Sequence, residues 1–181
     1  EPALNTVDYF QPYQLNLPGK MYTRNYTFPK NLRTYDRYAE GKNIVDTQNV
    51  AAIIKGSKYP ESYIIITGHL DHVGKDGDIV YNGADDNGSG TVSILEIAQA
   101  FQIAVNDGKR PKRSIVFLHV SGEEEGLLGS EYYVNNPLYP VKETFANLNL
   151  DMIGRTDPTR GYNNEDYIYS IGSDRISKEL K

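Results

Sequence analysis

The stretch "RSIVFLHVSGEEEGLLGS" covers residues 113–130 and leads an apolar run directly into three adjacent glutamates. The first part is rich in β-branched and other apolar residues, which predicts a strand that is buried on both faces of a sheet. Glu123, Glu124 and Glu125 then place three like charges, which repel one another, at the end of that strand. The glutamates therefore form either a solvated turn or a site that faces a positive charge.

Strand and helix patterns alternate on both sides of this stretch. Further strands are predicted at residues 49–56, 62–74, 145–152 and 166–172, and helices at 90–108, 125–136 and from 174 onward. Residues 74–90 have the Gly, Asp and Asn composition of turns. This alternation predicts an α/β protein, a three-layer α/β/α sandwich with a mostly parallel mixed sheet.

The longest predicted helix has apolar residues three and four positions apart. We expect its buried face to consist of Val92, Leu95, Ala98, Phe101 and Val105. Residues 1–45 lack periodicity and predict an irregular arm with one short strand, and residues 46–181 predict one domain with a hydrophobic core.

Composition excludes several classes of function. The formal net charge of −5 argues against a nucleic-acid partner, which would require clustered Lys and Arg. The absence of cysteine excludes disulfides, thiolate metal ligands and a cysteine nucleophile. No apolar stretch reaches the roughly 18 residues of a membrane span. We expect Glu1, in place of an initiator Met, to be a processed end.

Polar residues follow the predicted strands at the carboxyl ends, where ligands bind in open α/β sheets. Several carboxylates and one imidazole cannot converge in a dry crevice without cations, because desolvation and repulsion oppose it. Oxygen and imidazole donors together suit Zn²⁺, with Mn²⁺ or Co²⁺ as alternatives. The candidate donors are His69, Asp71, Asp85, Asp86, Glu123, Glu124 and Asp151.

Each motif also has a simpler interpretation. Asp85 or Asp86 alone is typical of a helix N-cap, and the glutamate run alone is typical of a solvated helix start. The spacing of a calcium-binding EF-hand is absent, and residues 76–78 are interpreted as an ordinary turn. His119, inside an apolar strand, is interpreted as a core residue. His72 is interpreted as a residue at the rim of the site, because on an extended segment it points away from its neighbours.

Four ordered motifs, "GHLDHVG", "GADDNGSG", "SGEEEGLLGS" and "NLDMIGR", closely resemble the co-catalytic di-zinc aminopeptidase family. This family of zinc exopeptidases also contains glutamate carboxypeptidases and the transferrin receptor ectodomain. The resemblance covers residues 48–172 and implies the zinc exopeptidase fold. Residues 46–181 would then be the N-terminal portion of a zinc peptidase domain.

The resemblance also implies roles for single residues. His69 and Glu124 would bind one zinc ion, Asp151 the other, and Asp86 would bridge the two. Asp71 would be the carboxylate tied to His69, and Glu123 the general base. Glu125 would lie outside the site as a solvated helix residue, and the link from Asp86 to Asn87 would be a cis peptide.

One feature departs from the family pattern. The family's second zinc takes a further His downstream, and here none of the three His residues follows Asp151. We therefore expect the fold to be incomplete at the C-terminus, with the last ligand absent, so that this chain by itself could be an inactive fragment.

The resemblance implies a secreted or periplasmic aminopeptidase with two Zn²⁺ ions and a peptide substrate that has a free N-terminus. The two ions would activate a water that hydrolyses the N-terminal peptide bond, with Glu123 as general base. One alternative is a carboxypeptidase, dipeptidase or glutaminyl cyclase on the same fold, for which Arg155 is the nearby cation. Another is a non-catalytic, peptidase-like interaction domain. The oligomeric state is left open.

Overall fold

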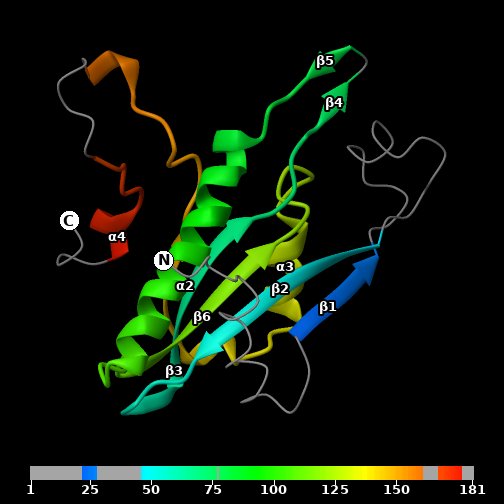
Figure 1. Ribbon diagram of the computed structural model, residues 1–181. Coiled ribbons are helices and arrows are strands. Elements are labelled where there is room, and N and C mark those ends of the chain that lie inside the picture. The colour runs from blue at the N-terminus through cyan, green and yellow to red at the C-terminus, as the bar shows by residue number, and fades with distance from the viewer. Residues whose placement is uncertain (1–21, 28–45, 77, 161–166, 177–181) are drawn as a thin grey trace.

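The computed structural model describes residues 22–27, 46–76, 78–160 and 167–176, and is built around a five-stranded sheet (Figure 1). The strands lie in the order β1–β2–β6–β3–β7, and a small hairpin of β4 and β5 extends from the sheet. The strand bounds are β1 Tyr22–Thr27, β2 Asp46–Ile54, β3 Tyr59–His69, β4 Lys75–Asp76, β5 Ile79–Val80, β6 Arg113–Val120 and β7 Thr144–Asn149.

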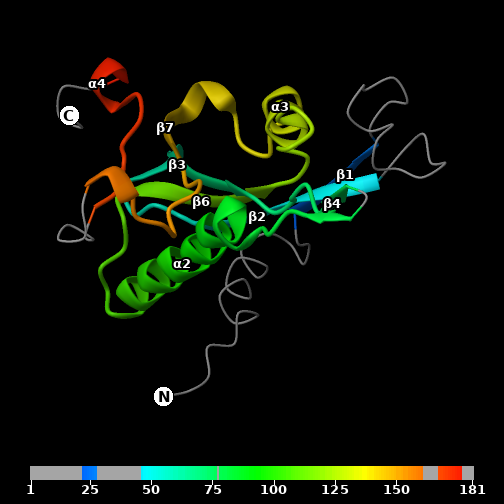
Figure 2. The same ribbon diagram turned by 90° about the horizontal axis from the view of Figure 1, so that it is seen from above.

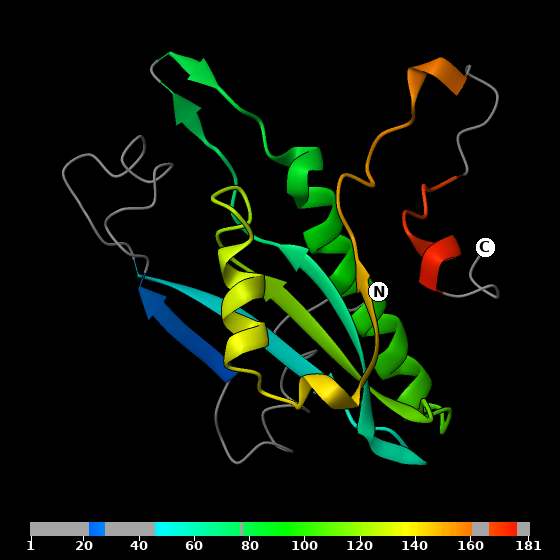
Figure 3. The same ribbon diagram turned by 180° about the vertical axis from the view of Figure 1, so that it is seen from behind.

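Helices cover both faces of the sheet. Seen from above, α2 lies on one side and α3 on the other (Figure 2), and from behind α3 crosses in front of the strands (Figure 3). The helix bounds are α2 Gly90–Asn106, α3 Leu128–Asn135 and α4 Ser173–Ile176, with an irregular turn at Ala84–Ser89 and single 3₁₀ turns at Val141–Glu143 and Pro158–Arg160. The predicted mixed α/β fold is confirmed.

Strand direction determines where the sheet can build a site. β6, β3 and β7 run parallel, so their carboxyl ends meet at one edge. β2 pairs antiparallel with β6, and β1 pairs antiparallel with β2, so β2 alone runs against the other four strands of this described sheet. β1 is the described part of the predicted N-terminal arm, and the rest of that arm lies outside the described residues.

The core lies on the central strands. β6 is buried from Ser114 to Val120, as its largely apolar sequence predicts for a strand that is covered on both faces of the sheet. Ile94 and Ala98 of α2 pack against this core, with Phe101 and Val105 beside them. The prediction of Val92 on the buried face is wrong, because its side chain is 56% exposed.

The predicted strand at 166–172 is also wrong. Residues 167–172, the described part of that segment, form no strand and lead into α4. Ile168 and Ile171 are exposed, the latter at 93%, so alternating apolar residues are not enough when no neighbouring strand pairs with them. Within the described residues, none of the helices is long and apolar enough to span a bilayer.

Candidate active site

Four segments converge at the carboxyl ends of the parallel strands. His69 is the last residue of β3, and Glu123 follows the end of β6 by three positions. Asp151 comes two residues after β7. The backbone N–H of Leu150 still donates to the Thr67 carbonyl at 2.8 Å, so the pairing of β7 with β3 continues up to the residue before Asp151. Asp86 comes from the irregular turn before α2. The predicted convergence of these segments is observed.

The first group of donor atoms comes from His69, Asp86 and Asp151, whose ligand atoms lie within 4.8 Å of one another. Nε2 of His69 is 3.1 Å from Oδ1 of Asp86 and 3.6 Å from Oδ1 of Asp151. The imidazole is 2% exposed, so its second ring nitrogen meets these carboxylates away from bulk water. An oxygen of Glu123 stands 3.9 Å from the same nitrogen.

The second group comes from His72, Asp86 and Glu124, so Asp86 belongs to both groups. Nδ1 of His72 is 2.8 Å from Oε1 of Glu124. His72 was predicted at the rim, pointing away, but it lies among the donors. The reason is that β3 ends at His69, and the strict alternation of a strand no longer applies three residues later.

The division of donors also differs from the expected one. The resemblance paired His69 with Glu124, but the geometry groups His69 with Asp151, and Glu124 with His72. Continued pairing of β7 with β3 through Leu150 places Asp151 beside His69. Glu124 comes four residues after the end of β6 and reaches the other side of Asp86.

Several of these atoms are covered but have no hydrogen-bond partner. They include Nε2 of His69, both ring nitrogens of His72 and Oε1 of Glu124. Buried polar atoms normally have hydrogen-bond partners. Here the histidine nitrogens lie close to carboxylate oxygens but form no hydrogen bonds with them. Convergent nitrogen and oxygen lone pairs with this deficit fit divalent cations such as Zn²⁺. The residues present therefore fit a metal centre.

Asp71 connects the two sides of the site. The backbone carbonyl of Asp71 lies 2.9 Å from Nδ1 of His69, and its carboxylate lies 3.8 Å from that nitrogen. Because a carbonyl only accepts, Nδ1 donates to it, and in the neutral imidazole the lone pair of Nε2 then faces the carboxylates. The carboxylate of Asp71 instead accepts the backbone N–H groups of Glu123 at 3.1 Å and Glu124 at 3.2 Å. Asp71 thus orients His69 and fixes the glutamate segment.

Comparison with known proteins assigns the sequence to a family. The family model for peptidase family M28 matches residues 49–180. The chain belongs to peptidase family M28. The resemblance found from the four motifs is confirmed.

Among solved structures, an aminopeptidase from Aneurinibacillus sp. strain AM-1 is similar with a TM-score of 0.54 and 30% identity, over 63% of this chain and 26% of that one. A glutaminyl cyclase from an Acidobacteriales bacterium is similar with a TM-score of 0.59 over 82% of this chain and 48% of that one. At 21% identity, this second likeness shows the fold alone.

Curated relatives include a probable glutamate carboxypeptidase VP8 from Zea mays, 33% identical over 115 residues, covering 63% of this chain and 15% of the relative. A leupeptin-inactivating enzyme 1 from Streptomyces exfoliatus is 39% identical over 100 residues, covering 55% of this chain and 21% of the relative. The chain spans between 8 and 27% of the length of the first such relatives.

Burial and neighbouring charges in this site shift the pKa values of two side chains, Glu123 and His69. Burial raises the pKa of Glu123, opposed by nearby His69 and reinforced by the carboxylates of Glu124, Asp151 and Asp71. Burial alone would lower the pKa of His69, but the hydrogen bond to the Asp71 backbone and the surrounding negative charges raise it above its usual value. A glutamate with a raised pKa is better matched to accepting and returning a proton near neutral pH.

Two acidic residues next to the donors, Glu125 and Asp85, have surroundings that differ from those predicted. Oε2 of Glu125 is covered and has no hydrogen-bond partner, so Glu125 is less solvated than predicted, although it belongs to neither donor group. Asp85 is also outside both groups, because its carboxylate accepts the N–H of Gly154.

His119 is buried with Nε2 3.1 Å from the Thr91 carbonyl, as predicted for a core residue. The link from Asp86 to Asn87 is cis, as expected.

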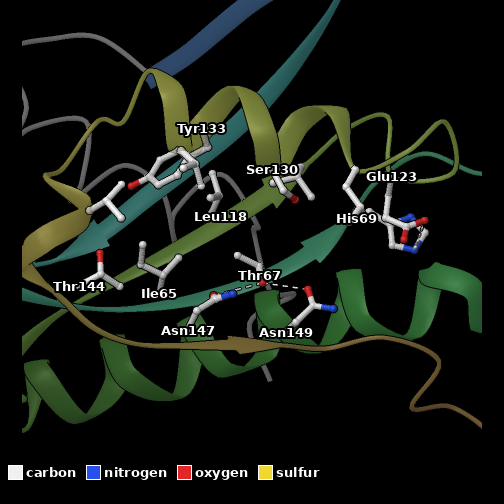
Figure 4. Close-up of a pocket in the computed structure, with 14 residues that line it drawn as sticks. Ile65, Thr67, His69, Leu118, Glu123, Ser130, Tyr133, Thr144, Asn147 and Asn149 are labelled. Atoms are coloured by element: carbon white, nitrogen blue, oxygen red, sulfur yellow. Dashed lines mark hydrogen bonds and ion pairs between the residues drawn. The ribbon is translucent and has the colours of Figure 1, made fainter. Parts of the chain in front are cut away.

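A largely apolar pocket of about 360 Å³ extends from the donor residues along the α3 face of the sheet (Figure 4). Sequence reasoning did not identify it, although alternate residues of neighbouring strands supply its floor. These are Ile65, Thr67 and His69 on β3 and Leu118 and Val120 on β6. Glu123 and His69 stand at one end and Tyr133 lies toward the other (Figure 4).

Proposed function

We propose that this chain carries the metal-binding part of a zinc peptidase that acts as an aminopeptidase. The observation that carries the proposal is the pair of donor groups that share Asp86. Oε2 of Glu123 lies beside them, 3.9 Å from Nε2 of His69. Membership of the M28 family and the likeness to a bacterial aminopeptidase support it.

Zinc would be held by His69, Asp86 and Asp151 on one side and by Asp86 and Glu124, with His72 beside them, on the other. Two such ions, when bound, supply Lewis acidity and lower the pKa of a water between them. The names of relatives from Pyricularia oryzae and other fungi, which are probable zinc metalloproteases, favour zinc among the candidate metals.

Glu123 would accept the proton of the attacking water and return it to the leaving amine. Its carboxylate is partly buried, and its raised pKa suits both steps. Asp71 would keep this carboxylate in place through the two backbone N–H groups that it accepts. It would also keep His69 in the tautomer that presents Nε2 to the donor group.

The substrate would be a peptide with a free N-terminus. A free α-amine would lie near both the metal ions and the carboxylates at this edge of the sheet, whereas an acylated nitrogen has neither the charge nor the basic lone pair for such contacts. The Streptomyces relative, named for inactivating the peptide leupeptin, supports a peptide substrate.

A carboxypeptidase is the second candidate, favoured by the 33% identical relative that is named as a probable glutamate carboxypeptidase. Recognition of a C-terminal carboxylate needs a cation near the donors. Arg155 was the candidate, but its side chain is 82% exposed and its Nε lies 3.8 Å from Oδ2 of Asp85. The charge of Arg155 is therefore already opposite a carboxylate.

A substrate panel on the full-length protein tests the proposal. Aminoacyl-nitroanilides should be hydrolysed, their N-acetylated forms should not, and a chelator should abolish the activity until zinc is restored. Glu123→Gln serves as the control for contaminating peptidases. Hydrolysis of N-acetylated peptides from the C-terminus would favour the carboxypeptidase. A metal-loaded protein that cleaves neither class would contradict the peptidase proposal.

A further inference from the structure

Asp85 precedes Asp86 in the chain, but its carboxylate is directed toward a different segment. Oδ1 of Asp85 accepts the backbone N–H of Gly154 at 2.8 Å, across 69 residues of sequence. The side chain is 12% exposed, and its other oxygen lies 3.8 Å from Nε of Arg155. Asp85 therefore contacts the loop that carries Asp151.

Two further side chains of the same turn reach that loop. Oγ of Ser89 accepts the N–H of Ile153 at 3.1 Å and donates to the Asp85 carbonyl at 2.7 Å. Nδ2 of Asn87 donates to the carbonyl of Leu150 at 2.9 Å. The backbone is thus held just before Asp151 and again two to three residues after it.

The contact between the two segments leaves little free space. A Cβ added at Gly154 would lie 2.9 Å from Cβ of Ser89 and 3.0 Å from Oδ1 of Asp85. On the other side of Asp151, a Cβ at Gly90 would come within 2.3 Å of the Leu150 carbonyl. The turn that carries Asp86 and the loop that carries Asp151 therefore fit closely together.

These contacts act against a specific force. Asp86 and Asp151 bring carboxylate oxygens within 4.8 Å of each other, and like charges at this range repel unless a cation lies between them. Hydrogen bonds between side chains of the turn and the backbone of the loop resist the separation of the two carboxylates. The hydrogen bond from Gly154 to Asp85 is the shorter of the two that follow Asp151.

We propose that Asp85 is a positioning residue, which fixes the distance between Asp86 and Asp151 by accepting the N–H of Gly154. The proposal rests on the metal-binding role proposed above. Neighbouring residues that orient metal ligands typically change metal affinity about 10- to 100-fold when they are removed. The chemical requirement is one side-chain acceptor at this position, and an amide oxygen can supply it as well as a carboxylate.

The test compares Asp85→Ala with Asp85→Asn in the full-length protein, using Co²⁺ as the probe. Affinity is measured by competition with a chelating dye, and the visible absorption of bound Co²⁺ reports its ligand geometry. Asp85→Ala should bind Co²⁺ about 10- to 100-fold more weakly and with an altered spectrum. Asp85→Asn should restore both properties. Asp78→Ala, which alters an exposed carboxylate in the β4–β5 hairpin, should match the wild type.

Each outcome separates this inference from the proposed function. A wild-type protein that does not bind Co²⁺ contradicts the metal-binding role itself. If the wild type binds and Asp85→Ala binds equally well, only the positioning role is overturned. It is also overturned if Asp85→Asn is as weak as Asp85→Ala, because the charge would then matter and not the hydrogen bond. If Asp85→Ala lacks a folded circular-dichroism spectrum, Asp85→Ser decides, because its side chain stays polar but is one bond too short to replace the acceptor of the Gly154 N–H. Weaker Co²⁺ binding is expected, and unchanged binding in a folded Asp85→Ser protein contradicts the proposal.

Discussion

Asp86 is the residue on which the site depends most, because both donor groups include it. Three residues near it in the chain are not in the donor groups. Asp85, Asn87 and Ser89 instead form hydrogen bonds with the backbone of the loop that carries Asp151. The motif "GADDNGSG" therefore encodes one donor together with the contacts that hold it. A motif read only for its donor misses this second task.

Glu123→Gln tests the proposed general base. The amide keeps the shape of the side chain but cannot accept a proton, so turnover should fall by at least about 10²- to 10⁴-fold. Metal content should remain at the wild-type level, because Glu123 belongs to neither donor group. Steady-state kinetics and elemental analysis of the same preparation check both statements. Near-normal turnover with metal bound would assign the base to another residue.

Glu124 and Glu125 are adjacent in the chain and should respond differently to truncation. Glu124→Ala removes a donor, so the rise in melting temperature on adding zinc should be lost or strongly reduced. Glu125→Ala removes a covered oxygen that has no partner, so the zinc-dependent rise should be unchanged. Thermal melts with zinc and with chelator measure both variants. The reverse result would mean that the glutamate roles are displaced by one residue.

Among single residues, the convergence could be predicted but the grouping could not. His69 ends one of the parallel strands, Glu123 and Asp151 follow two others, and the carboxyl ends of such strands meet at one edge. Whether Glu124 reaches His69 or His72 depends on the conformation of the loops beyond the strands, where period-two alternation no longer applies. The contact of Asp85 with Gly154 also depends on that loop geometry.

At the scale of elements, α2 shows the limit of periodicity. Most of its residues are apolar, so several faces satisfy a three- and four-residue spacing, and the sequence selected one that includes Val92. The structure buries Ala98, as predicted, but buries Ile94 and not Val92 on the face of α2 that contacts β3 and β6. Strands with uninterrupted apolar runs were easier to predict, since burial on both faces leaves no choice of face.

Truncating two residues of α2 tests which face is buried. Ile94→Ala should lower the free energy of unfolding by about 2–5 kcal/mol, because the side chain is fully buried. Val92→Ala should change it by about 0.5 kcal/mol or less, since Val92 is mostly exposed. Urea denaturation followed by circular dichroism measures both. Comparable losses in the two variants would contradict the observed orientation of the helix.

At the scale of the whole molecule, the sheet supplies the framework and a cation is expected to complete the site. The chain has a formal net charge of −5, and the acidic donors are concentrated at one edge of the sheet. Bound divalent ions would offset that local repulsion. Since they would bind the folded state with its donors assembled, they should also stabilise it.

Anomalous scattering at the zinc absorption edge, from crystals of the full-length protein grown with zinc, tests the central claim most directly. The account predicts two peaks about 3.5–4 Å apart. One should lie beside His69 and Asp151, the other beside Glu124, and both beside Asp86. No transition-metal peak among these residues, or a single ion with only oxygen ligands as for calcium, would contradict the account.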